Sequence, residues 1–154
     1  MTAPEFDVAA AHRHFASHCF NASWKVILQP DRTPEEDDTL VALGNASLWH
    51  WTNRADCTDK NLSIAHWLLA RIHCVVGRPV EAARHATRSL SLAERPGVAA
   101  YFRGAAHEAC ARAASLQGDR VTEEQHRDSA IQIAATLDDK EQKMLLDDLA
   151  TIRP

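Results

Sequence analysis

The sequence predicts an all-α protein, and three observations lead to this class. Segment 64–92 matches segment 105–133 position for position at an offset of 41 residues, as stacked helical repeats do. Apolar residues recur at helical spacing, and no segment alternates with the period of two that marks a strand. Only 5 glycines occur among 154 residues, and alanine is abundant. We therefore expect about seven helices, joined by short connections into antiparallel hairpins.

Two helices are predicted before residue 57. The first carries an apolar stripe from Phe6 to Leu28 and ends at Pro30. Thr33 then caps the second helix, and Glu36 completes a capping box three residues later. The predicted ranges are 5–29 and 34–55.

Each of the five further helices begins at a proline or a capping residue. We expect the third from Thr58-Asp59 to Gly77, the fourth from Pro79 to about Glu94, and the fifth from Pro96 to Gly118. Asp119 or Thr122 caps the sixth, and Asp138 with Glu141 predicts a short seventh over 139–150.

The segment 70–92 resembles a tetratricopeptide repeat (TPR). It has a small residue in helix A, glycine in the turn, an acidic residue and alanine at the start of helix B, and a small-Leu-x-Leu end. These positions are Ala70, Gly77, Glu81-Ala82 and Ser89-Leu90-Ser91-Leu92. The second copy is similar through Ala111, Gly118-Asp119 and Ala130-Ile131-Gln132-Ile133, but Glu123 replaces a small residue.

The resemblance implies a short right-handed TPR-like superhelix formed by a single domain over 1–154. It comprises a degenerate helix pair (1–57), two repeats (58–95 and 96–138) and a capping helix (139–154). The family's usual period is about 34 residues, so the offset of 41 leaves about seven additional residues. They fall between Leu92 and Gly104, and we expect the fifth helix to project beyond an ordinary helix A.

TPR proteins present helix A toward a concave groove, which implies a binding site on this chain. Arg71 and Arg112 occupy the same slot one repeat apart, and forked guanidinium groups suit carboxylates. With Trp67 as an apolar anchor, they predict a non-catalytic module that binds a protein or an acidic peptide. Alternatively, each arginine pairs with an acid of its own chain, such as Glu108. The predicted groove residues are Ile64, Trp67, Arg71, Cys74, Val75, Glu108, Arg112 and Ser115.

Four aromatic residues predict a contact between two copies of the chain. Trp49 and Trp51 differ in direction by ~200° on a helix, so one belongs to the core and the other faces a neighbouring layer, a ligand or another subunit. Tyr101 and Phe102 stand in the turns expected to project from the fifth helix. A homodimer is therefore a second expectation.

Nine histidines suggest an alternative function, a metal- or small-molecule-dependent enzyme or sensor. His14 and His18 share a helix face as two zinc ligands would, but no third ligand motif accompanies them. His107 and Cys110 share another flank. The pairs His66/His85 and His107/His126 recur with the repeat, and we expect them to pack between helices. No catalytic or phosphate-loop motif occurs, so we predict no enzyme activity, cofactor or metal.

Charge is distributed unevenly around a formal net charge of −4. Residues 59–118 carry 8 basic and 4 acidic side chains, and both flanks are acidic. The pI of about 6.1 argues against nucleic-acid binding. No run of 18 apolar residues and no signal-peptide pattern is present, so the sequence predicts a cytoplasmic protein without a membrane span, with its four cysteines reduced.

Overall fold

The computed structural model describes residues 6–153, and this part of the chain forms seven α-helices and no strand, as the sequence predicts. Residues 1–5 and 154, the ends of the predicted domain, lie outside the described residues. The helices are α1 Val8–Ile27, α2 Pro34–Thr52, α3 Asp59–Val75, α4 Pro79–Ala93, α5 Ala100–Gln117, α6 Arg120–Ala134 and α7 Asp139–Ala150. Among them, none is long and apolar enough to cross a bilayer.

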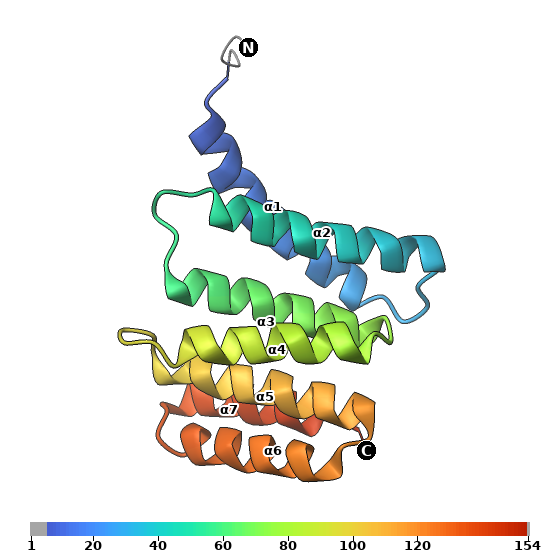
Figure 1. Ribbon diagram of the computed structural model, residues 1–154, viewed down its shortest axis with the longest axis vertical. Helices are drawn as coiled ribbons and strands as arrows, with labels where there is room; N and C mark the ends of the chain where they lie inside the picture. The colour runs from blue at the N-terminus through green and yellow to red at the C-terminus, as the bar shows by residue number, and fades with distance from the viewer. Residues whose placement is uncertain (1–5, 154) are drawn as a thin grey trace.

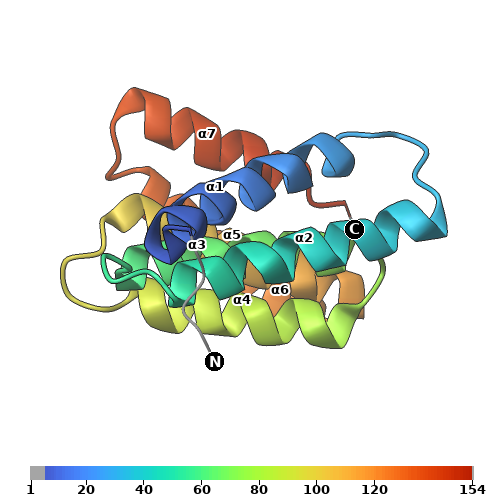
Figure 2. The ribbon, with the colours of Figure 1, turned by 90° about the horizontal axis from the view of Figure 1, so that it is seen from above.

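The helices form three antiparallel hairpins that follow one another along the long axis of the molecule (Figure 1). The hairpins are α1/α2, α3/α4 and α5/α6; α2 packs on α3, and α4 packs on α5. Helix α7 packs on α5 and α6. Figure 2 shows α1 and α7 on one side of α3 and α5, and α4 and α6 on the other. The face of α3 and α5 opposite their hairpin partners therefore lies between α1 and α7.

The predicted helix starts at three caps are confirmed. Thr33 accepts a hydrogen bond from the Glu36 backbone N–H, and the Glu36 carboxylate accepts one from the Thr33 N–H, which completes the capping box. Thr58 and Asn61 form the same reciprocal pair before α3. Asp138 accepts from the backbone N–H three residues later and caps α7. Each cap satisfies amide groups that the first helical turn leaves unpaired.

The offset of 41 residues is present in the helices themselves. Helices α4 and α6 have 15 residues each, and both their first and their last residues are separated by this offset. The preceding turns match as well: Gly77 and Gly118 have φ of 71° and 75°, the left-handed backbone that glycine adopts without strain. The α3/α4 and α5/α6 hairpins are thus structural copies of one unit.

The prediction that the fifth helix projects is wrong. Helix α5 begins at Ala100 rather than Pro96, and its 18 residues exceed those of α3 by one. The additional residues of the repeat lie in the connection after Ala93, where Gly97 adopts φ of 85°. A left-handed residue one position after Pro96 interrupts the helix, so these residues lengthen the loop and not α5.

Small buried residues let the α3/α4 and α5/α6 hairpins approach closely. The core between α3, α4 and α5 consists of Ala70, Ala82, Ala86, Ala109, Cys110 and Ala113. Larger side chains fill the core of the N-terminal half, where Leu40, Leu68 and Ile72 are fully buried and Trp24 packs against them. Burying a leucine or isoleucine side chain stabilises a fold by about 1.5–3 kcal/mol, so this aliphatic cluster anchors α2 to α3.

Candidate functional site

A hollow of about 390 Å³ lies beside α3 and α5, between the end of α1 and the end of the chain. We call it the Arg71–Arg112 hollow. It contains five of the eight predicted groove residues: Arg71, Cys74, Val75, Arg112 and Ser115. The other residues that line it are Ile27, Leu116, Ile152 and Arg153. Three arginines and no carboxylate side chain therefore line an otherwise mostly apolar hollow.

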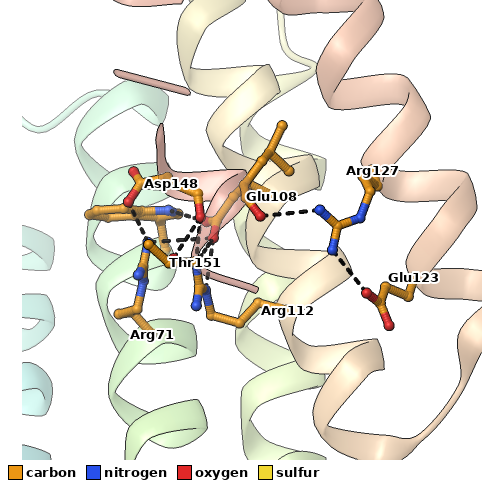
Figure 3. Close-up of polar contacts among 9 residues, drawn as sticks. Arg71, Glu108, Arg112, Glu123, Arg127, Asp148 and Thr151 are labelled. Atoms are coloured by element: carbon orange, nitrogen blue, oxygen red, sulfur yellow. Dashed lines mark hydrogen bonds and ion pairs between the residues drawn. The ribbon is translucent and has the colours of Figure 1, made fainter. Parts of the chain in front are cut away.

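Arg71 and Arg112 share one buried carboxylate, that of Glu108 (Figure 3). The distances are 3.4 Å from Arg71 Nη2 and 2.8 Å from Arg112 Nε, both to Glu108 Oε1. Arg71 Nη2 also lies 3.0 Å from Asp148 Oδ1 of α7. Because Glu108 is 1% exposed, this pairing within the chain, the alternative that the sequence left open, fixes both arginines in place.

Helix α1 covers the predicted aromatic anchor. The rings of Trp67 and Trp24 lie 5.6 Å apart between centroids, and Trp67 Nε1 donates to Glu108 Oε2 at 3.4 Å. The Arg71 guanidinium lies 5.6 Å from the Trp67 ring centroid. Neither Trp67 nor Glu108 lines the hollow, because α1 crosses this part of α3. Trp67 and Glu108 hold the arginines in position on the side away from the hollow.

The arginines also bind the end of α7, which the sequence did not predict. Arg112 Nη2 donates to the backbone oxygen of Asp148 at 2.9 Å and to Thr151 Oγ1 at 2.6 Å. Ser115 Oγ donates to the backbone oxygen of Arg153 at 2.9 Å. These partners are at least 36 residues away in sequence, so no periodicity relates them. The acidic pair Asp147-Asp148, near the end of α7, was a signal in the sequence for a contact with arginine.

Arg127 of α6 binds a carboxylate of its own helix and a backbone oxygen near the end of α7 (Figure 3). Arg127 Nη2 donates to Glu123 Oε1 at 3.0 Å, and Arg127 Nη1 donates to the backbone oxygen of Leu149 at 3.1 Å. Glu123 is the residue that departs from the small position of the TPR pattern. Its carboxylate accepts from Arg127, which in turn reaches the Leu149 backbone oxygen of α7.

The remaining predicted site residues lie away from this hollow. Ile64 lines two smaller hollows, one of them with Tyr101 and Phe102. Trp49 is 63% exposed and Trp51 is half-buried, so the expectation that one of them is a core residue is wrong. The Arg54 guanidinium lies 4.1 Å from the Trp51 ring centroid, and Trp51 lines a hollow with residues of α1 and α3. The dimer contact of these four aromatics stays a prediction.

Each hairpin holds one histidine pair, which confirms the expected packing and adds a third pair. The two Nδ1 atoms lie 2.9 Å apart in each of His12/His50, His66/His85 and His107/His126. The N-terminal pair escaped the periodicity because its members are 38 residues apart, against 19 in the other two. His12 stands near the start of α1 and His50 near the end of α2, far from the connection between the two helices, so more residues separate the two rings.

Burial lowers the pKa of the rings in the pairs His66/His85 and His107/His126. It lowers the pKa of His66 and of His107 to about 4, and that of His85 to about 3. Positive charge adds to the effect at His66, where Arg88 and Arg84 disfavour the imidazolium. Two neutral rings can share one hydrogen bond between their nitrogens, whereas two imidazolium ions would repel.

The other candidate ligands and nucleophiles do not converge. The His14 and His18 rings stack at 5.3 Å, and residues 6–153 contain no group of three His, Cys, Asp or Glu side chains placed to hold a metal. Burial raises the pKa of the Cys110 thiol to about 12, the reverse of the shift that activates a nucleophile. The Glu108 carboxylate accepts from Arg112, and its charge and that of Glu94 raise the pKa of the Cys110 thiol further.

Comparisons with protein-family models, with curated proteins and with solved structures give no match to this chain. The resemblance to TPR proteins therefore rests on the residues of its repeats.

Proposed function

We propose that this protein is a non-catalytic interaction module that binds an acidic peptide segment or a free C-terminal carboxylate of a partner protein in the Arg71–Arg112 hollow. The observation that carries this proposal is the lining of the hollow: three guanidinium groups beside apolar side chains, with no carboxylate side chain among them. Apolar walls with a few convergent charged groups are typical of binding sites.

The charge balance of the hollow favours an anionic ligand. Glu108 and Asp148 together offset two of the three arginines. Arg153 makes no ion pair with any residue from 6 to 153, and its backbone is held by Ser115. A carboxylate that reaches Arg153 and the remaining donors of Arg112 would gain charge-assisted hydrogen bonds. Ile27, Val75, Leu116 and Ile152 would contact its apolar neighbours.

The finer architecture belongs to the same proposal. We infer that the three hairpins form a short right-handed TPR-like superhelix in which α1 and α7 narrow the concave side. The arrangement of hairpins in Figures 1 and 2 and the copied turns support this inference. Helix α7 then limits the groove to a short ligand, such as the last few residues of a chain.

The experiment measures fluorescence anisotropy with labelled acidic peptides that end either in a free carboxylate or in an amide. Arg71 and Arg112 are unsuitable targets, since they hold Glu108 and α7. We use Arg153→Glu and Leu116→Asp, both at exposed positions of the lining. Each is expected to weaken binding of the free-carboxylate peptide at least ~10-fold, because an attractive charge or an apolar contact becomes repulsive.

Arg103→Glu is the matched control, an equal charge reversal at an exposed site outside the hollow. It should bind as the parent does. Equal affinity of the parent, Arg153→Glu and Leu116→Asp for these peptides would contradict the proposal. So would equal loss in all three variants, which would indicate net charge alone.

A further inference from the structure

A second hollow, of about 470 Å³, lies where α3 and α4 meet. We call it the Arg84–Arg88 hollow. His66, Arg84, His85, Thr87, Arg88 and Ser91 line it, so every one of its side chains carries a hydrogen-bonding group. No acidic residue lines it, and its volume falls within the roughly 300–1,000 Å³ typical of small-molecule sites.

The two arginines are not neutralised by acids of the chain. Arg78 and Arg95, their neighbours in the basic middle segment, pair with Asp38 at 3.8 Å and with Asp59 at 2.8 Å. Arg84 and Arg88 form no ion pair with any side chain between residues 6 and 153. They stand one helical turn apart on the same face of α4, so both guanidinium groups can reach one ligand.

Arg84 sets the protonation of the histidine pair. Its Nη2 lies 3.1 Å from His85 Nε2, and because a guanidinium only donates, Nε2 is the acceptor. Neutral His85 therefore carries its proton on Nδ1 and donates to His66 Nδ1 at 2.9 Å. His66 must then carry its proton on Nε2, which has no hydrogen-bond partner among the described residues.

This chain of hydrogen bonds leaves only donors for a ligand. Among residues 6–153, no acceptor binds the His66 Nε2–H, the remaining N–H groups of Arg84 or any of those of Arg88. The hydroxyls of Thr87 and Ser91 add two groups that donate or accept. A small oxyanion complements this set, and a phosphate group, with about −1.5 to −2 charge at pH 7 and several acceptor oxygens, complements it best.

We propose that the Arg84–Arg88 hollow binds a phosphate group, either inorganic phosphate or the phosphate of a small monoester. Arg84 and Arg88 hold the oxygens by charge-assisted hydrogen bonds, and His66 donates from Nε2. Arg84 binds the ligand and His85 at once through different nitrogens. This site is independent of the Arg71–Arg112 hollow and of the peptide ligand proposed for it.

The α5/α6 hairpin supplies an internal control. It has the same histidine pair, His107 and His126, but the positions equivalent to Arg84 and Arg88 are Gln125 and Ser129, and Asp128 stands where Thr87 does. An anion that simply seeks imidazole rings would affect both pairs. A ligand of the Arg84–Arg88 hollow affects His66 and His85 and leaves His107 and His126 unchanged.

The test titrates the intact chain at pH 7 and constant ionic strength with sodium phosphate, with O-phospho-L-serine and with sodium chloride. Imidazole nitrogen resonances are followed by long-range 1H–15N NMR. We expect the His66 and His85 signals to shift saturably with phosphate or phosphoserine, while His107 and His126 stay unchanged. Tighter binding of phosphoserine identifies a monoester as the ligand, and equal binding identifies free phosphate.

Arg84→Gln/Arg88→Ser copies the residues of the α5/α6 hairpin and should weaken this binding at least ~10-fold, because the charge-assisted bonds are lost. Both positions are exposed, so the fold should be retained, which far-UV circular dichroism checks. Arg103→Gln/Lys140→Gln removes two exposed charges elsewhere and should bind as the parent does. The proposal is overturned by shifts that do not saturate, by equal shifts in both histidine pairs, or by unchanged binding of Arg84→Gln/Arg88→Ser.

Discussion

The α3/α4 and α5/α6 hairpins share their helix offsets, turn glycines and histidine pairs, yet they stabilise their surroundings by different means. Ala82 and Ala86 of α4 are buried against α5, whereas the equivalent positions of α6 hold the ion pair of Glu123 and Arg127. A difference in what lies next to each hairpin accounts for the contrast. Helix α4 packs on α5, the first helix of the next hairpin, whereas α6 packs on α7.

The same contrast occurs on the inner helices. Trp67 of α3 packs on Trp24, and the equivalent position of α5 is Glu108, which binds arginines of both hairpins. One backbone unit thus supports an apolar contact in the middle of the stack and an ionic network near its end. The comparison teaches that the repeat sets where side chains point, and that the neighbour sets what chemistry they need.

The largest effect is expected from Glu108→Ala. Removing the shared carboxylate leaves Arg71 and Arg112 partly buried without it, and breaking a buried ion pair from one side costs about 3–5 kcal/mol. Urea unfolding followed by circular dichroism measures the loss. Glu124→Ala, at an exposed position of α6, is the control. A loss below about 1 kcal/mol, the range of surface pairs, would contradict a structural role for Glu108.

The second prediction makes α6 resemble α4. Arg127→Ala leaves Glu123 buried without its main partner and frees the Leu149 carbonyl, which we expect to cost about 2 kcal/mol. The double substitution Glu123→Ala/Arg127→Ala removes both charges and should cost less than the single one, since no buried charge remains. Urea unfolding of the two variants decides the order. A double variant that loses as much stability as Arg127→Ala, or more, would contradict this coupling.

A smaller effect is expected at a hydrogen-bonded pair that the α3/α4 hairpin has and the α5/α6 hairpin lacks. Ser63 Oγ donates to the Ser89 carbonyl at 3.0 Å, and Ser89 Oγ donates to the Ser63 carbonyl at 2.9 Å. The position equivalent to Ser89 is Ala130 in the α5/α6 hairpin. We expect Ser89→Ala to lower the unfolding free energy by about 1 kcal/mol, the typical contribution of one hydrogen bond. Ser91→Ala, exposed on the same helix, should leave stability unchanged.

The smallest effect is a difference in pH dependence between the hairpins. The pKa values of His66 and His85 are lowered to about 4 and about 3, so the unfolded chain takes up protons first as pH falls below about 6.5. Their contribution to stability is complete above pH 6.5 and declines toward pH 4 and below. Histidines dominate this window down to about pH 5, where most carboxylates are still ionised.

Two double variants separate the contribution of His66/His85 from that of His107/His126. His66→Leu/His85→Leu should flatten the fall of the urea midpoint between pH 7 and 5, and His107→Leu/His126→Leu should flatten it less. The pKa of His85 is lowered furthest, to about 3, by burial and then by Arg84, whereas at His107 burial is followed by His126 and by one arginine, Arg103. Parent-like slopes in both variants would show that neither pair titrates with unfolding.

Much of the fold followed from local sequence. The caps at Thr33, Thr58 and Asp138, and the match at 41 residues, predicted the helices mostly to within three residues. The start of α5 was missed because Pro96 is as good a helix start as Pro79, and only the left-handed Gly97 distinguishes them. The pair His12/His50 was missed because its members lie near the start of α1 and the end of α2, so their spacing in sequence differs from that of the other two pairs.

The candidate site was predicted in part. Five groove residues share one hollow because equivalent positions of two copied helices face the same side. Asp148, Thr151 and Arg153 could not be found in this way, since they contact Arg71, Arg112 and Ser115 across more than 35 residues. Contacts of that kind depend on where α7 folds back, and nothing periodic encodes this position.

Helix content, hairpin order and the recurrence of the histidine pairs are properties of the sequence alone, because capping, apolar spacing and repetition act over a few residues at a time. The partners of the charged side chains are a property of the assembled molecule. Whether an arginine meets a buried glutamate, as Arg71 does, or remains without an acid, as Arg84 does, depends on which helix lies beside it. Electrostatic pairing requires proximity in space, which packing alone creates.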